Sequence, residues 1–88
     1  MAYSLEVEEH TERKFRKLAK KDKAQLKIIN RKVQEILENP YQFKPLRGDM
    51  HGARRVHIGK SFVLIYEVEE DRKLVRILDY EHHDKVYG

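Results

Sequence analysis

The spacing of apolar residues in the first half of the chain changes from the period of a strand to the period of helices. Residues 3–7 alternate between apolar and polar side chains, which predicts a half-buried strand. Apolar residues then recur every three or four positions, which predicts two helices. Thr11 is expected to cap the first helix. Asp22 begins a capping-box pattern for the second helix, which ends at Asn39-Pro40, so the two helices should form a hairpin with a shared apolar seam.

The second half of the chain has the pattern of three strands. A loop over residues 40–53 contains both prolines and separates these strands from the helices. Residues 55–58 alternate, whereas residues 62–68 and 74–80 are apolar on both faces, which is typical of central strands. The predicted fold class is α+β, a single domain over residues 1–88 with the element order β-α-α-β-β-β. In this fold the helix hairpin packs on a small, mostly antiparallel, twisted sheet.

A two-residue turn at Gly59-Lys60 is expected to join the first two strands of this half, and it sets which side chains share a face. With this turn, Arg55 and His57 lie on the same face as three apolar residues of the next strand. These three are Phe62, Leu64 and Tyr66, and the opposite face then holds Val56, Val63 and Ile65. A face that mixes arginine, histidine and aromatic rings packs poorly against helices, so we expect it to line a cleft. The alternative is an ordinary solvent-exposed face of the sheet.

Positive charge is concentrated in the predicted helices. The 88 residues include 19 Lys+Arg and 15 Asp+Glu, which gives a formal net charge of +4. Residues 11–32 alone contain ten basic and two acidic residues. Clustered positive charge favours contact with phosphate backbones or with an acidic protein. A solvated helix face is the simpler alternative.

The composition excludes some classes of protein. Without cysteine, the chain has no disulfide framework, no cysteine-ligated metal and no thiol catalysis. Its longest apolar run, residues 62–66, is far shorter than the roughly 18–20 residues of a membrane span. Acidic residues near the N-terminus argue against an export signal. We therefore expect a cytoplasmic protein without a membrane partner.

Two patterns suggest a phosphate loop and a metal site, but the neighbouring residues argue against both. The segment GKS at residues 59–61 lacks the earlier glycine of a phosphate loop, where Arg54 stands, and a strand follows it instead of a helix. The histidines show no spacing typical of a metal site, and the neighbours His82 and His83 would point to opposite faces of a strand. We expect neither a metal nor another cofactor.

The basic and aromatic residues of the last strands and of the chain end fit the cleavage of RNA by its own 2′-hydroxyl. This reaction needs a base for the 2′ proton, cations for the charge that develops on the phosphate, and an acid for the departing 5′ oxygen. Histidine suits both proton-transfer roles, arginine presents paired donors to a phosphate, and aromatic rings stack on unpaired bases. The composition permits this chemistry and does not by itself establish it. The candidate catalytic residues are Arg55, His57, His82, His83 and Tyr87.

Three segments carry a family resemblance: residues 46–48 (LRG), residues 55–66 (RVHIGKSFVLIY) and residues 82–87 (HHDKVY). Together with the element order, they resemble the RelE/ParE superfamily of toxins from type II toxin–antitoxin systems, over essentially the whole chain. The resemblance implies the RelE-like fold of microbial RNases. It also implies one of two activities. RelE-like members are ribosome-dependent mRNA endonucleases that cut the codon in the A site without a metal, whereas ParE-like members poison DNA gyrase.

The resemblance extends to individual residues. Arg55 and His57 match the basic strand residues of the family, and His82 matches the histidine of its C-terminal motif. Tyr87 matches the tyrosine of the same motif. In this mapping either His57 or His82 takes the 2′ proton. Arg55 with His83 holds the phosphate charge, and Tyr87 orients or stacks on a base.

Two positions depart from the family pattern. Val63 stands where many active RNases have an arginine, and His83 stands where the C-terminal arginine often lies. Loss of the strand arginine removes one cation from the transition state. Arg54, Lys60 or His83 is expected to replace it if the site is active.

The leading hypothesis is an mRNA interferase whose partners are the ribosome with its A-site mRNA and an acidic, RelB-like antitoxin. A partly disordered acidic segment suits a chain of charge +4, and the two proteins are expected to form a hetero-oligomer. Residues expected to bind RNA, besides the basic helices, are Lys44, Arg47, Arg54 and Lys60. Two alternatives stay open: a gyrase inhibitor that acts by binding, and a non-catalytic remnant that binds only its antitoxin.

Overall fold

The computed structural model describes residues 3–45 and 52–87, apart from the side chain of Tyr87, so that the LRG segment with Arg47 lies outside the described residues. The predicted order β-α-α-β-β-β is confirmed, with a short helix added at the end. The elements are β1 (Ser4–Val7), α1 (Glu9–Lys21), α2 (Lys23–Glu38), β2 (Ala53–Ile58), β3 (Phe62–Glu69), the 3-10 turn η1 (Glu70–Arg72), β4 (Leu74–His82) and α3 (His83–Tyr87). No helix in the described part of the chain has the length and apolar content needed to span a membrane.

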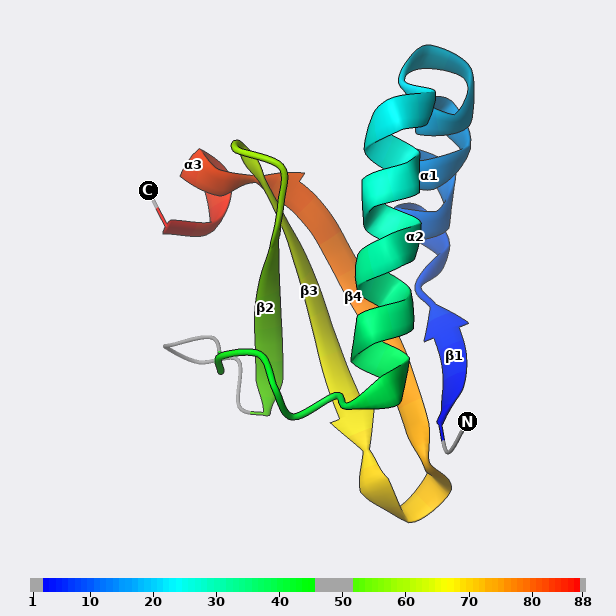
Figure 1. Cartoon of the computed structure of the whole chain (residues 1–88), viewed down its shortest axis with the longest axis vertical. Coiled ribbons are helices and arrows are strands. Elements are labelled where there is room, and N and C mark those ends of the chain that lie inside the picture. Colours follow the sequence, from blue (N-terminus) through cyan, green and yellow to red (C-terminus); the bar gives the residue numbers. More distant parts are fainter. Residues whose placement is uncertain (1–2, 46–51, 88) are drawn as a thin grey trace.

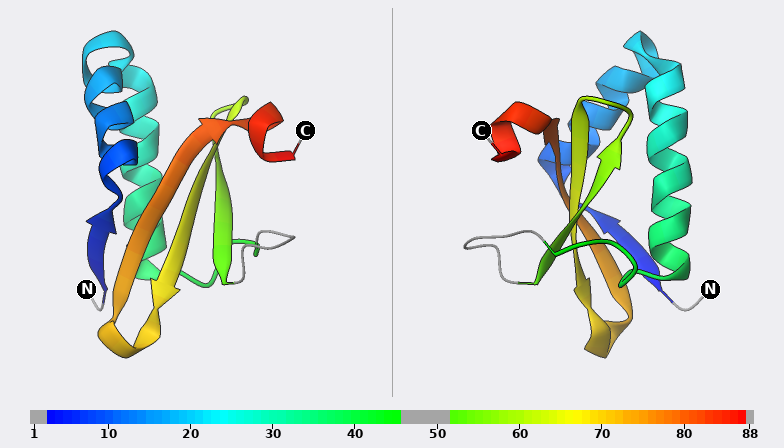
Figure 2. Two further views of the ribbon diagram at one scale, coloured as in Figure 1. Left: turned by 180° about the vertical axis from the view of Figure 1, so that it is seen from behind. Right: turned by 60° about the vertical axis from the view of Figure 1, so that its left-hand side comes forward.

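The strands form one sheet in the order β1-β4-β3-β2. Strand β1 runs parallel to β4, and the other neighbouring strands are antiparallel. This arrangement confirms the predicted, mostly antiparallel sheet with β3 and β4 at its centre. Helices α1 and α2 stand together against one face of the sheet, whereas α3 lies on the other side (Figure 1). Figure 2 shows the twist of the strands and the same separation of α3 from the helix pair.

The two long helices meet at Asp22, which ends α1 and caps α2. Its carboxylate accepts a hydrogen bond of 3.1 Å from the backbone N–H of Gln25, as the capping pattern predicts. The start of α1 differs from the prediction, because Glu8 occupies the cap position and Thr11 lies inside the helix. Thr11 is fully buried, and its hydroxyl donates to the backbone carbonyl of Leu78 at 2.9 Å. The predicted Thr11 cap is therefore wrong, since this hydroxyl joins α1 to β4 instead.

The main core lies between the helix pair and the sheet. Its buried residues are Ile29, Val33, Ile36, Leu37, Val56, Ile58, Leu64, Tyr66, Val75, Ile77 and Tyr80. The apolar stripe predicted for the second helix thus faces the sheet. Tyr66 is fully buried, and its hydroxyl donates to the backbone carbonyl of Pro40 at 2.5 Å, which joins β3 to the chain just after α2. Burial raises the pKa of this hydroxyl to about 12, so it remains a donor at physiological pH.

The loop between β2 and β3 is one residue longer than predicted. Ile58 pairs with Phe62, so the loop contains Gly59, Lys60 and Ser61. Gly59 has a φ of 62°, a left-handed conformation that suits glycine at the start of such a loop. A shift of one residue moves every side chain of a strand to the other face. A strand that is apolar on both faces gives no alternation to fix the register, and this is why the sequence-based pairing is wrong.

The corrected register changes the composition of both faces of the sheet. Arg55 pairs with Ile65 and His57 pairs with Val63, so these four residues share one face. The three residues predicted to lie beside Arg55 and His57 face the helix pair instead. They are Phe62, Leu64 and Tyr66.

Candidate active site

The candidate site lies on the face of the sheet opposite α1 and α2, which we call the open face. A small apolar cluster forms its base, with Ala53, Val63 and Ile65 buried. Leu78 from β4 and Val86 from α3 pack against this cluster. The contact explains why the chain turns into α3 after β4, because a five-residue helix could not form without tertiary packing. It also places α3 against β3 and β4, with His83 at its start next to His57 of β2.

Two imidazoles predicted to be catalytic meet on this face. The rings of His57, on β2, and His83, the first residue of α3, stack with their centroids 5.8 Å apart and their planes inclined by 24°. The backbone N–H of His83 donates to the carbonyl of Ser61 at 2.7 Å. This hydrogen bond joins the start of α3 to the β2–β3 loop and so helps to fix the position of His83 relative to β2.

Three cationic residues line a hollow beside His57. This hollow, of about 480 Å³ along the outer edge of β2, is lined by Lys32, Lys44, Arg55 and His57, among others. The carbonyl of Lys44 accepts a hydrogen bond of 3.0 Å from the backbone N–H of Arg55, which holds the loop after α2 against this edge. The residues that line the hollow thus carry two ammonium groups, a guanidinium and an imidazole, which are groups that bind phosphate and transfer protons.

His82, by contrast, lies apart from the stacked pair. Its ring meets the ring of Phe62 edge-on at 5.3 Å, and Phe62 belongs to the helix-covered side of the sheet. Its Nδ1 accepts a hydrogen bond of 3.2 Å from the backbone N–H of Asp84. The boundary between β4 and α3 falls between His82 and His83, so these two neighbours contact different parts of the molecule.

The remaining predicted residues do not gather in the same place. The guanidinium of Arg54 donates to the carbonyl of Phe43 at 2.7 Å and lies 5.1 Å from the ring centroid of Tyr41, so its contacts hold the loop after α2. Lys60 lines a different pocket, described below. Tyr87 lies in α3, and its side chain is outside the described residues. The structure therefore brings together Lys44, Arg55, His57 and His83 from the predicted set.

Val63 is fully buried in the apolar base of the open face. The position where many family members carry an arginine thus holds a packing residue in this chain. Within residues 3–45 and 52–87, no three histidine, aspartate or glutamate side chains gather in the way that a metal site requires.

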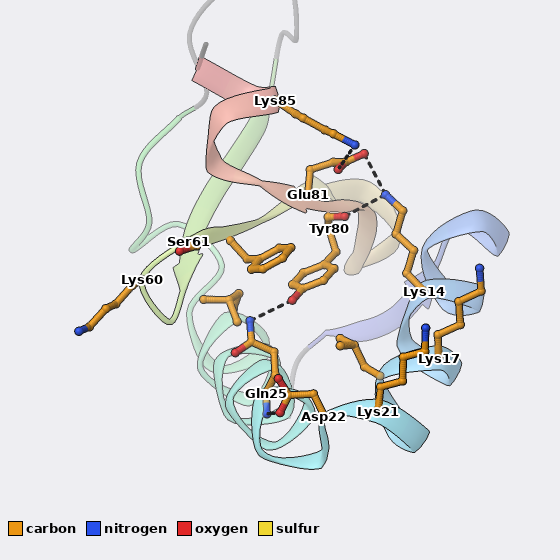
Figure 3. Close-up of a pocket in the computed structure, with 13 residues that line it drawn as sticks. Lys14, Lys17, Lys21, Asp22, Gln25, Lys60, Ser61, Tyr80, Glu81 and Lys85 are labelled. Atoms are coloured by element: carbon orange, nitrogen blue, oxygen red, sulfur yellow. Dashed lines mark hydrogen bonds and ion pairs between the residues drawn. The ribbon is translucent and has the colours of Figure 1, made fainter.

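A pocket of about 540 Å³ between α1 and the end of the sheet was not expected from the sequence (Figure 3). Lys14 is fixed at its edge, because its ammonium donates to Asp79 at 2.8 Å, to the carbonyl of Tyr80 at 2.9 Å and to Glu81 at 3.1 Å. Burial, the largest influence, lowers the pKa of Lys14, but the hydrogen bonds to Asp79 and Glu81 outweigh it and the pKa is raised. The spacing of Lys14, Lys17 and Lys21 along α1 was the signal available in the sequence, since it places all three on one side of a helix.

Comparison with known proteins agrees with this fold over almost the whole chain. A solved structure of a YoeB/ParE toxin from Agrobacterium tumefaciens matches with a TM-score of 0.83 at 18% identity, covering 91% of this chain and 98% of that one. The intact E. coli RelBE toxin–antitoxin complex contains a chain that matches with a TM-score of 0.78 at 27% identity, covering 90% and 94% of the two chains.

The sequence itself matches at the level of a family. A protein of Methanocaldococcus jannaschii named "Putative toxin RelE4" is 42% identical over 85 residues, which is 97% of this chain and 90% of that protein. Residues 2–87 match the family described as "ParE toxin of type II toxin-antitoxin system, parDE". These matches confirm the resemblance found in the sequence, and the chain belongs to the ParE toxin family of type II toxin–antitoxin systems, within the RelE/ParE superfamily.

Proposed function

We propose that this toxin is a metal-independent endoribonuclease that cuts mRNA in the ribosomal A site and so inhibits translation. The observation that carries the proposal is the stacked pair of His57 and His83 beside Arg55. Two imidazoles at this separation can serve one phosphodiester, one taking a proton and the other giving one. The likeness to E. coli RelE structures and the relative named as a RelE toxin support the same reading.

The reaction proceeds by attack of the 2′ oxygen on the adjacent phosphorus. One imidazole of the His57–His83 pair removes the 2′ proton as the bond from the 2′ oxygen to phosphorus forms. The bond from phosphorus to the 5′ oxygen breaks, and the other imidazole gives that oxygen a proton, leaving a 2′,3′-cyclic phosphate and a 5′-hydroxyl. Arg55 stabilises the negative charge that grows on the phosphate oxygens. Because His82 contacts Phe62 instead, it is assigned no proton-transfer step.

Lys44 compensates for the missing strand arginine. Val63 offers no charge, but Lys44 lines the same hollow as Arg55 and His57. A second cation in this hollow stabilises the same phosphate oxygens that the strand arginine contacts in other family members. Tyr87, at the end of α3, orients or stacks on a base next to the scissile phosphate. Arg54, Arg47 and Lys60 contribute to RNA binding outside the reacting centre.

The toxin is held inactive by an acidic antitoxin in the cytoplasm. The matched E. coli chain is solved in a toxin–antitoxin complex, and this chain carries a net charge of +4. An acidic, partly disordered segment that folds on binding would neutralise this charge and cover the open face. The RelB-like partner and the ribosome are both parts of this proposal.

A second function is favoured by a specific observation, namely that the matched family is described as that of ParE toxins. A ParE-like chain inhibits DNA gyrase by binding and breaks no bond in RNA. The replacement of the strand arginine by a buried valine is consistent with this function, since a gyrase inhibitor has no need of that cation.

The two functions are separated by translation of a defined mRNA in a purified ribosomal system, followed by primer extension. The nuclease proposal predicts cuts in register with the A-site codon, and their loss in Arg55→Ala. Arg72→Ala is the matched control, because Arg72 is an exposed arginine of η1 that lies outside the basic helices and does not line the hollow. Intact message together with inhibited DNA supercoiling by gyrase would reject the nuclease and support the second function.

A further inference from the structure

Thr11 combines a polar side chain with a fully buried position on α1. Apart from tyrosines, no other polar residue is buried within residues 3–45 and 52–87. Its hydroxyl donates to the backbone carbonyl of Leu78 at 2.9 Å, and without such a partner a buried hydroxyl would destabilise the core. The ring of His10 also reaches this hydroxyl, with Nε2 at 3.2 Å, but His10 is exposed. The buried partner of the hydroxyl is thus on β4.

Leu78 is the extra residue of a β-bulge in β4. Its two neighbours, Ile77 and Asp79, pair with consecutive residues of β3, so Leu78 itself has no partner on that strand. Ile77 and Tyr80 both face the helix pair, although side chains three residues apart in a regular strand point to opposite faces. The bulge therefore exchanges the two faces of β4 beyond Leu78.

The bulge also sets the register in which β4 reaches the candidate active site. With the bulge, His82 pairs with Phe62, and the N–H of His83 meets the carbonyl of the loop residue before Phe62 at 2.7 Å. Without the extra residue, Glu81 would stand opposite Phe62, and His83 would lie one residue, roughly 3.3 Å, further along. The stacking of His83 on His57, with the ring centroids 5.8 Å apart, depends on this register.

The start of α1 supplies the donor that holds the bulge. Strand β1 ends at Val7, which pairs with Ile77, and the N–H of Glu8 donates to the carbonyl of Ile77 at 3.0 Å. Consecutive carbonyls of a regular strand point in opposite directions, but the carbonyl of Leu78 also faces the start of α1, where it accepts from Thr11. The Thr11 hydroxyl therefore satisfies a carbonyl that the bulge has turned out of the usual pattern.

We propose that Thr11 is a positioning residue of the candidate active site, because its buried hydroxyl fixes the bulge at Leu78 and thereby the placement of His83 on His57. The inference rests on the proposed function for the reaction that this placement serves, and not for the placement itself. Thr11 does not line the hollow beside His57, so it acts through β4. Lys14 also bonds to the strand beyond the bulge, but it does so from a long and partly exposed side chain that can follow either register.

The test compares Thr11→Val, which removes the hydroxyl and keeps the shape of the side chain, with Thr11→Ser, which keeps the hydroxyl. NMR measures the placement of His83 in two ways: the NOE between the ring protons of His57 and His83, and the exchange rate of the His83 amide hydrogen. In Thr11→Val the NOE should be lost, and the amide should exchange faster by about tenfold or more. In Thr11→Ser both should stay near the wild-type values.

Ile36→Val is the matched control for a loss of core stability. Ile36 is fully buried on α2, and its truncation removes no hydrogen bond to β4, so the NOE should be retained. The rate of single-turnover mRNA cleavage should fall by about 10²-fold in Thr11→Val, because a small misplacement of a reacting group is costly. It should stay within about twofold of the wild-type rate in Thr11→Ser and in Ile36→Val.

A retained NOE in folded Thr11→Val, loss of the NOE in Ile36→Val as well, or full cleavage by a Thr11→Val protein that has lost the NOE would overturn the proposal. If Thr11→Val does not fold, Thr11→Ser decides, since a retained NOE supports the role of the hydroxyl and a lost NOE overturns it. A wild-type protein that cleaves no mRNA but shows the expected NMR differences would reject the nuclease proposal and leave the placement of His83 by Thr11 intact.

Discussion

The two faces of the sheet differ in how much of their surface is covered and in what they carry. The face under α1 and α2 holds a continuous core that includes Leu64 and Tyr66. The open face has three buried apolar residues covered by a five-residue helix, and its polar residues stay accessible. Strand β2 contributes to both, with Val56 in the core and Arg55 on the open face. Stability is thus concentrated on one face, and the other face is available for chemistry.

The largest effect on stability is expected from truncating the helix-covered face. Leu64→Ala should lower the free energy of unfolding by about 3–5 kcal/mol, because Leu64 is fully buried between the sheet and the helices. Ile65 is the next residue and lies on the open face. Ile65→Ala should lower the free energy of unfolding by about 2 kcal/mol, since the short helix α3 can move to fill part of the cavity. Urea unfolding monitored by circular dichroism measures both values. A larger cost for Ile65→Ala would contradict the comparison of the two faces.

Arg55 and Ile58 should show that activity and stability depend on different residues of β2. Arg55→Ala is expected to lower the rate of mRNA cleavage by about 10²–10³-fold and to change the free energy of unfolding by about 1 kcal/mol or less. Ile58→Ala should lower the free energy of unfolding by about 2–4 kcal/mol with cleavage by the folded protein little changed, because Ile58 is fully buried in the core and does not line the hollow that contains Arg55. Single-turnover cleavage and urea unfolding of both variants provide the measurement. Equal losses of activity in the two variants would mean that Arg55 acts only through the fold.

Tyr66→Phe tests the connection between the helix-covered face and the loop that carries Lys44. Removal of the hydroxyl leaves the buried carbonyl of Pro40 without its partner and should cost about 1–2 kcal/mol of unfolding free energy. Tyr3→Phe is the control, because the Tyr3 hydroxyl donates to Glu70 at an exposed position. If both substitutions lower the free energy of unfolding by the same amount, the buried hydrogen bond to Pro40 stabilises the fold no more than an exposed one.

The smallest effect on stability is expected at the connection between β3 and β4, which belongs to neither face of the sheet. Hydrogen bonds from Lys73, Tyr41 and Tyr3 lower the pKa of the Glu70 carboxyl from 4.5 to about 2. A lowered pKa in the folded state stabilises the fold at pH values above about 4.5, and this contribution is lost as the pH falls through about 2. Tyr41→Phe should raise the pKa of Glu70, as measured by the pH dependence of its carboxyl ¹³C shift. An unchanged titration would show that the Tyr41 hydroxyl has no influence on this carboxyl.

The sequence predicted the elements of this fold well because their signals are local. The capping pattern at Asp22 and the stop at Asn39 define the ends of α2 without reference to the rest of the chain. Thr11 shows the limit of this reasoning, since a residue suited to capping is used instead to bond the carbonyl of Leu78. Helix α3 depends on contacts of Val86 with a cluster formed by distant strands, and no local pattern indicates it.

The grouping of the candidate site residues could be predicted only in part. Residue type and the family resemblance selected Arg55, His57 and His83 as candidates, and the structure places the rings of His57 and His83 in contact. The β3 residues predicted to lie beside Arg55 and His57 were wrong. The length of the loop at Gly59 sets the pairing of β2 with β3, and one extra loop residue moves each β3 side chain to the opposite face. The separation of His82 from His83 also depends on where β4 ends, which an apolar strand does not specify.

The most direct test of the open face as a catalytic surface is a double-mutant cycle on mRNA cleavage in programmed ribosomes, with His57→Ala, His83→Ala and the double variant. Two imidazoles that act on one phosphate should each lower the rate by about 10²-fold or more, and the double variant should be little slower than the slower single variant. If the fold-loss of the double variant equals the product of the two single losses, the residues act independently, which would contradict a shared role. Cleavage rates that do not fall at all would contradict it as well.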